Sequence, residues 1–176
     1  MRLKFTIFTG LSALAACSSP PPPPPSPVAA PPSTPAVVAS PAAIRPTGEW
    51  TDWPLAAGNW IYRQDERGSI ALFGVANTDA AVTLRCDRAR QRIFLARAGA
   101  GAGRMVIRSS SAKKEFEGQS TGGVPAYIAT EIMPRDSILD AMIFSRGRIA
   151  IDVAGQAPLA IPTWSEIARV VEDCRD

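Results

Sequence analysis

The chain has 176 residues and a formal net charge of +3, and it contains no histidine. Arg2 and Lys4 belong to a segment that we expect to be removed, which leaves +1, so the basic charge is no argument for nucleic acid. The lack of histidine removes the usual proton shuttle at neutral pH and the commonest transition-metal ligand. Most hydrolase mechanisms are thereby excluded, and we expect neither enzyme activity nor a cofactor.

The first 16 residues have the pattern of an export signal. Arg2 and Lys4 precede a short apolar stretch that ends in the small residues before Cys17. The stretch is too short to span a bilayer as a helix, and small residues suit the cut site of a processing enzyme. An uncleaved N-terminal anchor is the alternative, which this length and the following proline run disfavour.

Residues 14–17 (LAAC) resemble the lipobox of bacterial lipoproteins. The resemblance implies that the Cys17 sulfur is acylated with diacylglycerol, that residues 1–16 are cut away, and that Cys17 becomes the new N-terminus. In that family the residue after the cysteine influences sorting, and Ser18 is similar to the outer-membrane type. We therefore expect a palmitate-bearing lipoprotein of the outer membrane that faces either the periplasm or the cell surface.

Residues 17–48 are expected to form a disordered spacer. Residues 18–48 contain 12 of the 17 prolines, including the unbroken run 20–25. Proline fixes φ and lacks an amide donor, so this run favours extended polyproline II and cannot build a packed core. At about 3.1 Å per residue the spacer reaches at most roughly 90 Å, which would hold a domain clear of the membrane.

A β-rich domain is expected over residues 49–176, where tryptophans and short apolar runs separated by glycine begin. Alternation of apolar and polar residues predicts three hairpins and two further strands, over residues 60–73, 82–97, 148–161, 105–108 and 126–132. Residues 110–114 and 118–122 are expected to be polar or glycine-rich loops.

Two helices complete the expected domain. Residues 136–144 have helical spacing with Asp136 as the cap. Residues 163–166 fit a capping box in which Thr163 and Glu166 satisfy free amides, and the helix that follows carries Cys174 on its apolar face. The fold class expected is α+β, a mainly antiparallel β sandwich or partly open barrel with the C-terminal helix packed on the sheet.

Cys86 and Cys174 are expected to form a disulfide. Cys86 shares the apolar face of a strand with Val82 and Leu84, and Cys174 shares that of the last helix, so both sulfurs point to one core. An exported protein folds in an oxidising compartment. Two separate buried thiols remain the alternative.

The hairpins of residues 60–97 and the second half, 136–175, resemble small envelope proteins of alphaproteobacteria. They are similar to the invasion-associated locus B family, whose members are exported β-rich domains. The resemblance implies export and a β-rich fold, and it transfers no site residue.

Two serine motifs have the spacing of catalytic sites. Ser120 lies in a G-x-S-x-G pattern, but the chain has no histidine base and the residues that follow read as extended. Ser110 and Ser111 each precede a lysine at S-x-x-K spacing, but the companion motifs of penicillin-binding enzymes are missing. Both motifs are interpreted as loops, and a Ser/Lys acyl enzyme is kept only as a remote alternative.

Residues 85–114 carry a charge of +8, whereas 115–176 carry −5. Arginines on hairpins could bind an anionic envelope component through bidentate contacts; the alternative is that they pair across strands or solvate the outer face. The candidate anion-binding residues are Arg85, Arg88, Arg90, Arg92 and Arg97. The function expected is a membrane-tethered, non-enzymatic binding or envelope-structural domain, with a surface-exposed inhibitor or host-interaction factor as the alternative.

Overall fold

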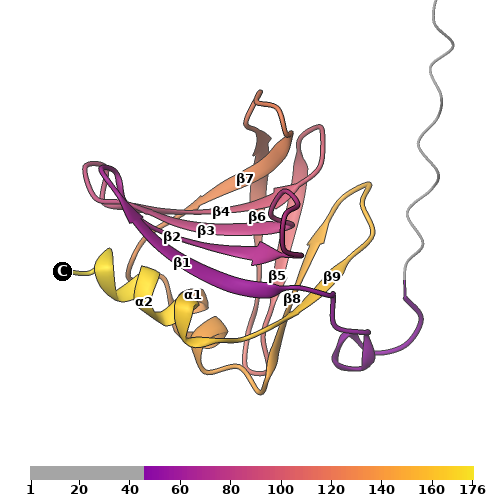
Figure 1. Cartoon of the computed structure of the whole chain (residues 1–176). Helices are drawn as coiled ribbons and strands as arrows, with labels where there is room; N and C mark the ends of the chain where they lie inside the picture. The colour runs from indigo at the N-terminus through magenta and orange to yellow at the C-terminus, as the bar shows by residue number, and fades with distance from the viewer. Residues whose placement is uncertain (1–45) are drawn as a thin grey trace, which may run out of the picture. The chain divides into compact units, whose positions relative to one another are not determined.

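The computed structural model describes residues 46–176, so the predicted signal peptide, Cys17 and most of the predicted spacer lie outside the described residues. The described part contains a nine-stranded sheet, a short 3-10 helix and two α-helices (Figure 1). In chain order these are η1 (Trp50–Asp52), β1 (Asn59–Asp65), β2 (Gly68–Gly74), β3 (Val82–Asp87), β4 (Arg92–Ala98), β5 (Gly103–Arg108), β6 (Lys113–Ser120), β7 (Tyr127–Ile132), α1 (Ser137–Ile143), β8 (Arg148–Val153), β9 (Leu159–Pro162) and α2 (Ser165–Asp173).

The sheet is antiparallel and curls into a half-barrel, with the strand order β1-β2-β3-β4-β7-β6-β5-β8-β9 (Figure 1). Its two end strands approach each other. Leu55 forms an isolated parallel bridge with Ala160, and the Ala56 amide donates to the Ala160 carbonyl at 2.8 Å. Trp60 Nε1 donates to the Pro162 carbonyl at 2.9 Å. These contacts hold β9 against the start of β1 and the residues before it. The expected α+β fold with a partly open barrel is confirmed.

The three predicted hairpins are confirmed as β1–β2, β3–β4 and β8–β9. Gly68 shows why one turn carries glycine. Its φ is +139°, and a Cβ placed there would lie 2.6 Å from the Cys86 carbonyl oxygen. Glycine therefore lets β2 and β3 approach each other at this turn.

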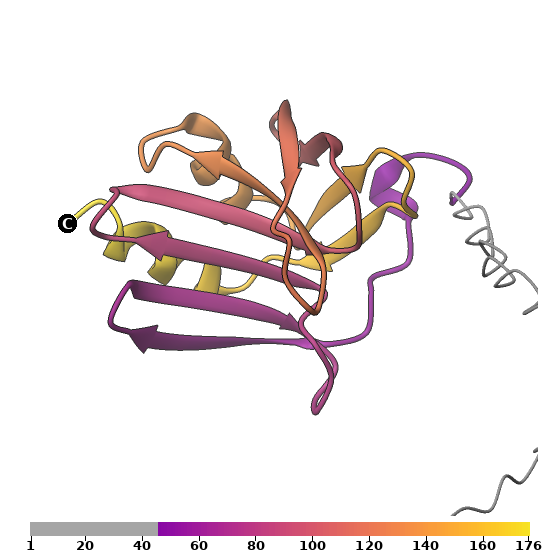
Figure 2. The same cartoon turned by 90° about the horizontal axis from the view of Figure 1, so that it is seen from above.

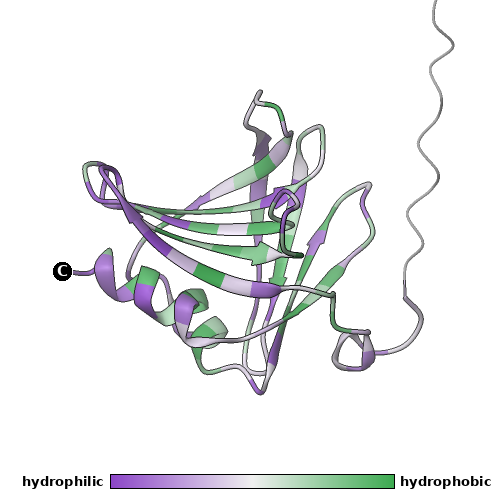
Figure 3. Cartoon of the chain, viewed as in Figure 1, coloured by the Kyte–Doolittle hydropathy of each residue, from purple (hydrophilic) through white to green (hydrophobic). Residues whose placement is uncertain are grey.

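The core fills the inner side of the curled sheet. Buried residues alternate with less buried ones along β2 and β3, and Figure 3 shows where hydrophobic residues lie along the strands and helices. Phe73, Leu84, Ile107 and Ile151 are fully buried, and each contributes about 1.5–3 kcal/mol by leaving water. Helix α2 contacts β1, β2 and β3 and buries Ile167, Val170 and Val171 completely.

The two helices begin in different ways. In α1 the predicted cap is confirmed, because the Asp136 carboxylate accepts from the Ile138 amide at 3.0 Å. The capping box predicted for α2 is wrong, since the helix begins after Trp164, which makes no side-chain cap. The Thr163 amide instead donates to the Gly147 carbonyl at 3.4 Å, which occupies the group that Glu166 was expected to bind.

Strand β6 was not predicted. The loops expected at 110–114 and 118–122 are wrong for the residues at the two ends of β6, which pairs with β5 from Lys113 to Gly118. The side of β6 that shares a face with buried Met105 and Ile107 carries Phe116 and Lys114. The strand therefore lacks the apolar alternation from which strands are predicted.

Candidate functional site

The structure separates the five candidate anion-binding arginines. Arg85 and Arg92 lie on the outer face of β3 and β4, and Arg88 and Arg90 lie in the turn that joins these strands. Arg97 lies at the far end of β4, and its side chain points to the inner side of the sheet because successive residues of a strand point to opposite faces. Four of the five arginines are therefore near one another, and Arg97 is not part of the group.

Arg97 has a structural contact at its own end of the sheet. It is 9% exposed, and its Nη2 donates to the Ala157 carbonyl at 2.7 Å. Burial lowers the pKa of this guanidinium, which still carries its proton because an arginine pKa starts so high. The contact ties β4 to the turn between β8 and β9.

Arg85 and Arg92 each form an ion pair across strands. Arg85 donates through both Nη atoms to Asp65, at 3.0 and 2.8 Å, and Arg92 Nε lies 2.7 Å from Glu131. The hydrogen bond from Arg85 is the main cause that lowers the pKa of Asp65. For these two arginines the geometry matches the cross-strand alternative more closely than an open anion site.

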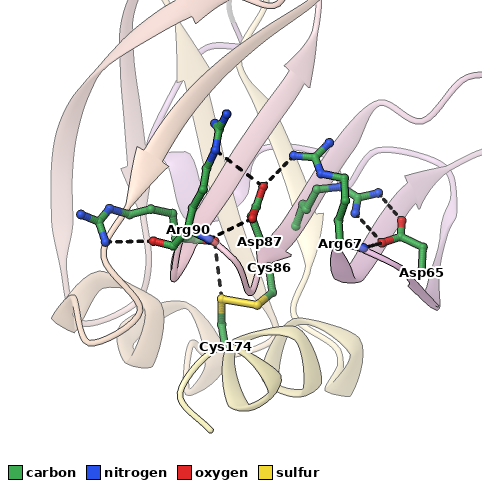
Figure 4. Close-up of polar contacts among 8 residues, drawn as sticks. Asp65, Arg67, Cys86, Asp87, Arg90 and Cys174 are labelled. Carbon is green, nitrogen blue, oxygen red and sulfur yellow. Dashed lines mark hydrogen bonds and ion pairs between the residues drawn. A yellow bond between two sulfur atoms is a disulfide. The ribbon is translucent and has the colours of Figure 1, made fainter.

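Asp87 accepts from two neighbouring turns (Figure 4). Its side chain is only 7% exposed, Arg67 Nη2 donates to it at 2.9 Å, and the Arg90 amide donates at 3.1 Å. The bond from Arg67 is the main cause that lowers the pKa of Asp87. The guanidinium of Arg90 lies 4.0 Å from the same carboxylate, and both arginine side chains remain more than half exposed. One carboxylate thus faces two guanidiniums, which leaves a local positive charge.

The predicted disulfide between Cys86 and Cys174 is confirmed and lies beneath these turns (Figure 4). The two Cα atoms are 5.4 Å apart, within the usual range for a bridge. Tyr62 Oη donates to Asp173 at 2.6 Å beside it. The C-terminal end of α2 is therefore fixed to β1 and β3, and it supports the arginine-bearing turns from the core side.

Strands β6 and β7 diverge over part of their length, as Figure 2 shows from above. The two strands pair only through Gln119 with Ala129 and Ser120 with Ile128. Beyond these pairs lies a cavity of about 790 Å³, which we call the β6–β7 groove. Its rim reaches Arg67 on the β1–β2 turn. The groove therefore extends from the diverging strands β6 and β7 to the positively charged turns that carry Arg67 and Arg90.

Two phenylalanines from neighbouring parts of the sheet line the β6–β7 groove. Phe94 lies on the outer face of β4, Phe116 lies on β6, and both are half-buried. The Arg90 guanidinium is 6.0 Å from the Phe94 ring centroid, and Lys114 Nζ is 5.4 Å from that of Phe116. An apolar lining with cations at its margin can hold an apolar group and orient a polar one.

A smaller hollow of about 450 Å³ lies on the outer face of β1 and β2, beneath the loop of residues 75–80. Ile61 and Val75 line it and are 48% and 53% exposed. Tyr127 Oη donates to the Ala80 carbonyl at 2.7 Å and holds the loop over the strands. Its charged lining residues are Arg63 and Asp79, and it lacks the pair of guanidiniums that borders the β6–β7 groove.

The serines of the two motifs make structural hydrogen bonds. Ser120 lies in β6 and its Oγ accepts from the Gly122 amide at 3.3 Å. Ser110 Oγ accepts from the Arg146 amide at 3.1 Å. The lysines of the S-x-x-K motifs pair with carboxylates instead, Lys113 with Glu115 and Lys114 with Asp136.

Within residues 46–176 no group of three or more aspartate, glutamate, cysteine or histidine side chains is placed to hold a metal ion. The same part of the chain contains no helix with the length and apolar character needed to cross a membrane.

No protein-family model matches the chain, and neither the curated proteins nor the solved structures contain a match to it.

Proposed function

We propose that the protein is a lipid-anchored lipoprotein of the cell envelope whose folded domain is a non-enzymatic binding module. The observation that carries the binding role is the β6–β7 groove, with its two half-buried phenylalanines and two exposed arginines that share Asp87. Ligand sites are typically concave and largely apolar, with a few polar groups that fix orientation. The groove is concave and combines two aromatic rings with polar and charged groups that could orient a ligand.

The proposed anchor is Cys17. Its support is the sequence alone: the lipobox-like residues 14–17, the positive and apolar stretch before them, and the proline-rich spacer after them. The disulfide agrees with this placement, because such bridges persist in oxidising compartments. A domain at the end of a long tether can bind a partner at a distance from the membrane.

The anchor is tested by Cys17→Ser. The variant should lose labelled palmitate and leave the membrane fraction, whereas Ser18→Ala, which keeps the thiol, should retain the label. Unchanged membrane association of Cys17→Ser without added lipid mass would refute the anchor.

The binding role is tested by photo-crosslinking in living cells. A photoreactive amino acid at Gln119, on the rim of the β6–β7 groove, should give a discrete adduct, and the same amino acid at exposed Glu172 on α2 should not. Equal adducts from the two positions would show that the groove has no special role.

A second candidate is a surface-exposed inhibitor or host-interaction factor, which the long spacer favours because it could carry the domain beyond the membrane. Protease added to intact cells should then remove the domain. Protection of the domain in intact cells, with digestion after lysis, would assign it to the inner side.

A further inference from the structure

The ladder between β6 and β7 ends after two pairs, although both strands continue. Extended in the same register, it would place Glu117 of β6 opposite Glu131 of β7. Like charges directly opposite each other destabilise a strand pair. The β6–β7 groove therefore opens at the point where two carboxylates would meet.

The backbone of Glu117 points into this groove. Successive residues of a strand direct their N–H and C=O groups to opposite neighbours. The Thr121 amide donates to the Tyr127 carbonyl at 2.9 Å, which shows that odd-numbered residues of β6 face β7. The even-numbered residues face β5. Within the described part of the chain, no strand pairs with the groove side of Glu117.

The edge of β7 is open in the same way. The Gly99 amide donates to the Ala126 carbonyl at 2.9 Å, so even-numbered residues of β7 face β4. The N–H and C=O groups of Glu131 consequently face the groove, where residues 46–176 supply no strand partner. An open edge of this kind is a template for another extended chain.

We propose that the β6–β7 groove binds an extended peptide of a partner protein, which adds to β6 as an antiparallel strand. The inference rests on the proposed binding function and names the partner of that site. The Glu117 backbone supplies main-chain hydrogen bonds, and Phe94, which lies on the outer face as the Glu117 side chain does, receives an apolar side chain of the peptide.

The charges around the groove specify the peptide further. The exposed Glu117 carboxylate forms no ion pair with another residue of the described region, so it favours a basic residue nearby. Arg67 and Arg90 share one carboxylate and favour an acidic residue at the other end. The best partner is therefore a strand with an apolar residue between acidic and basic residues.

The proline-rich stretch of the same chain is a poor occupant. Residues 18–48 contain 12 of the 17 prolines, and a proline has no N–H to donate to a ladder. A polyproline II segment would instead contact the phenylalanines without using the β6 backbone. The two occupants therefore differ in their dependence on the Glu117 amide.

The test selects random peptides displayed on phage against the full-length chain in detergent, and measures enriched peptides by calorimetry. Glu117→Pro removes the groove-facing amide but none of the bonds that even-numbered residues make to β5, and proline is tolerated on an open strand edge. Glu117→Ala removes only the carboxylate and is the matched control. Circular dichroism and unfolding midpoints establish that both variants fold.

Enriched peptides should alternate apolar and polar residues. Glu117→Pro should weaken their binding by about tenfold or more, because a peptide carbonyl loses its donor. Glu117→Ala should weaken it by less than about fivefold, as expected for an exposed charge. In the wild type, peptide should slow hydrogen exchange of the Glu117 amide, a readout that remains if the proline variant fails to fold.

Equal binding by wild type and Glu117→Pro, enrichment of proline-rich peptides only, or no enrichment would overturn strand addition. Phe94→Ser separates this failure from failure of the proposed function. If peptides bind equally well without the Glu117 amide but lose affinity on Phe94→Ser, the groove is still a binding site, but it does not bind by strand addition. Peptides insensitive to both changes would remove the groove from the function altogether.

Discussion

Removal of the Cys86–Cys174 bridge, by the double variant Cys86→Ala/Cys174→Ala, should lower the free energy of unfolding by about 4.5 kcal/mol. The two cysteines are 88 residues apart, and the chain-entropy relation gives this value for a loop of that length at 25 °C. Such a loss is a large fraction of the stability of an ordinary domain. At about 4 °C per kcal/mol, the melting temperature should fall by about 15–20 °C.

The native fold should survive this change, because α2 has other attachments at the same end. Tyr62 binds Asp173 at 2.6 Å, and Arg175 binds Asp140 at 2.8 Å. Guanidinium unfolding is the assay, with the wild type in reductant as the matched comparison. The double variant and the reduced wild type should unfold at the same guanidinium concentration, which should be lower than that of the oxidised wild type. A loss of less than about 1 kcal/mol in both would refute the loop-entropy reasoning.

Three further changes test other parts of the domain. Trp60→Phe keeps an aromatic ring but removes the bond to the Pro162 carbonyl and part of a buried ring system, and it should cost about 1–3 kcal/mol in urea unfolding. Gly118→Ala would place a Cβ 2.6 Å from Ile128 and should cost about 1–3 kcal/mol. In the control, Gly123→Ala, the nearest atom is 3.7 Å away, and the change should stay within about 0.5 kcal/mol. Hydrogen bonds hold the pKa of Asp87 below its usual 3.8, so this carboxylate stabilises the fold above about pH 4 and the effect is lost as the pH falls further. Asp87→Asn should flatten the decline of unfolding free energy in acid, and an unchanged acid profile would contradict the assignment.

The sequence predicted those parts of the fold in which one face of an element is apolar and a turn signal lies close by. The strand of residues 82–86 and the last helix each carried a cysteine on an apolar face, and this was enough to predict their pairing. Strand β6 gave no such signal. Its inward side carries Lys114 and Phe116 because it borders the groove and not only the core.

The groove itself could not be predicted from local pattern. It lies where Glu117 would oppose Glu131, two residues that are distant in sequence and that only the register of Gln119 with Ala129 would bring opposite each other. The ion pairs of the arginines could not be predicted from local pattern either. Arg85 binds Asp65 across an intervening strand, so the pairing requires the strand order and register. The capping box failed because a distant carbonyl, that of Gly147, took the Thr163 amide.

The disulfide also divides the chain mechanically. Residues 86–174, which include β4 to α2 and every lining residue of the β6–β7 groove except Arg67, lie inside the covalent loop, whereas η1, β1, β2 and most of β3 lie outside it. A pull between the N-terminal chain and a partner held at β6 therefore loads β1 and β2 first. At most the roughly 40 residues from 46 to 85 can be drawn out, an extension of about 140 Å, before the covalent bridge bears the load. Arg67 would leave the groove, but its lining residues on β4, β6 and β7 would remain within the covalent loop, so under the proposed anchor and partner the bridge would limit how far tension can separate the binding site.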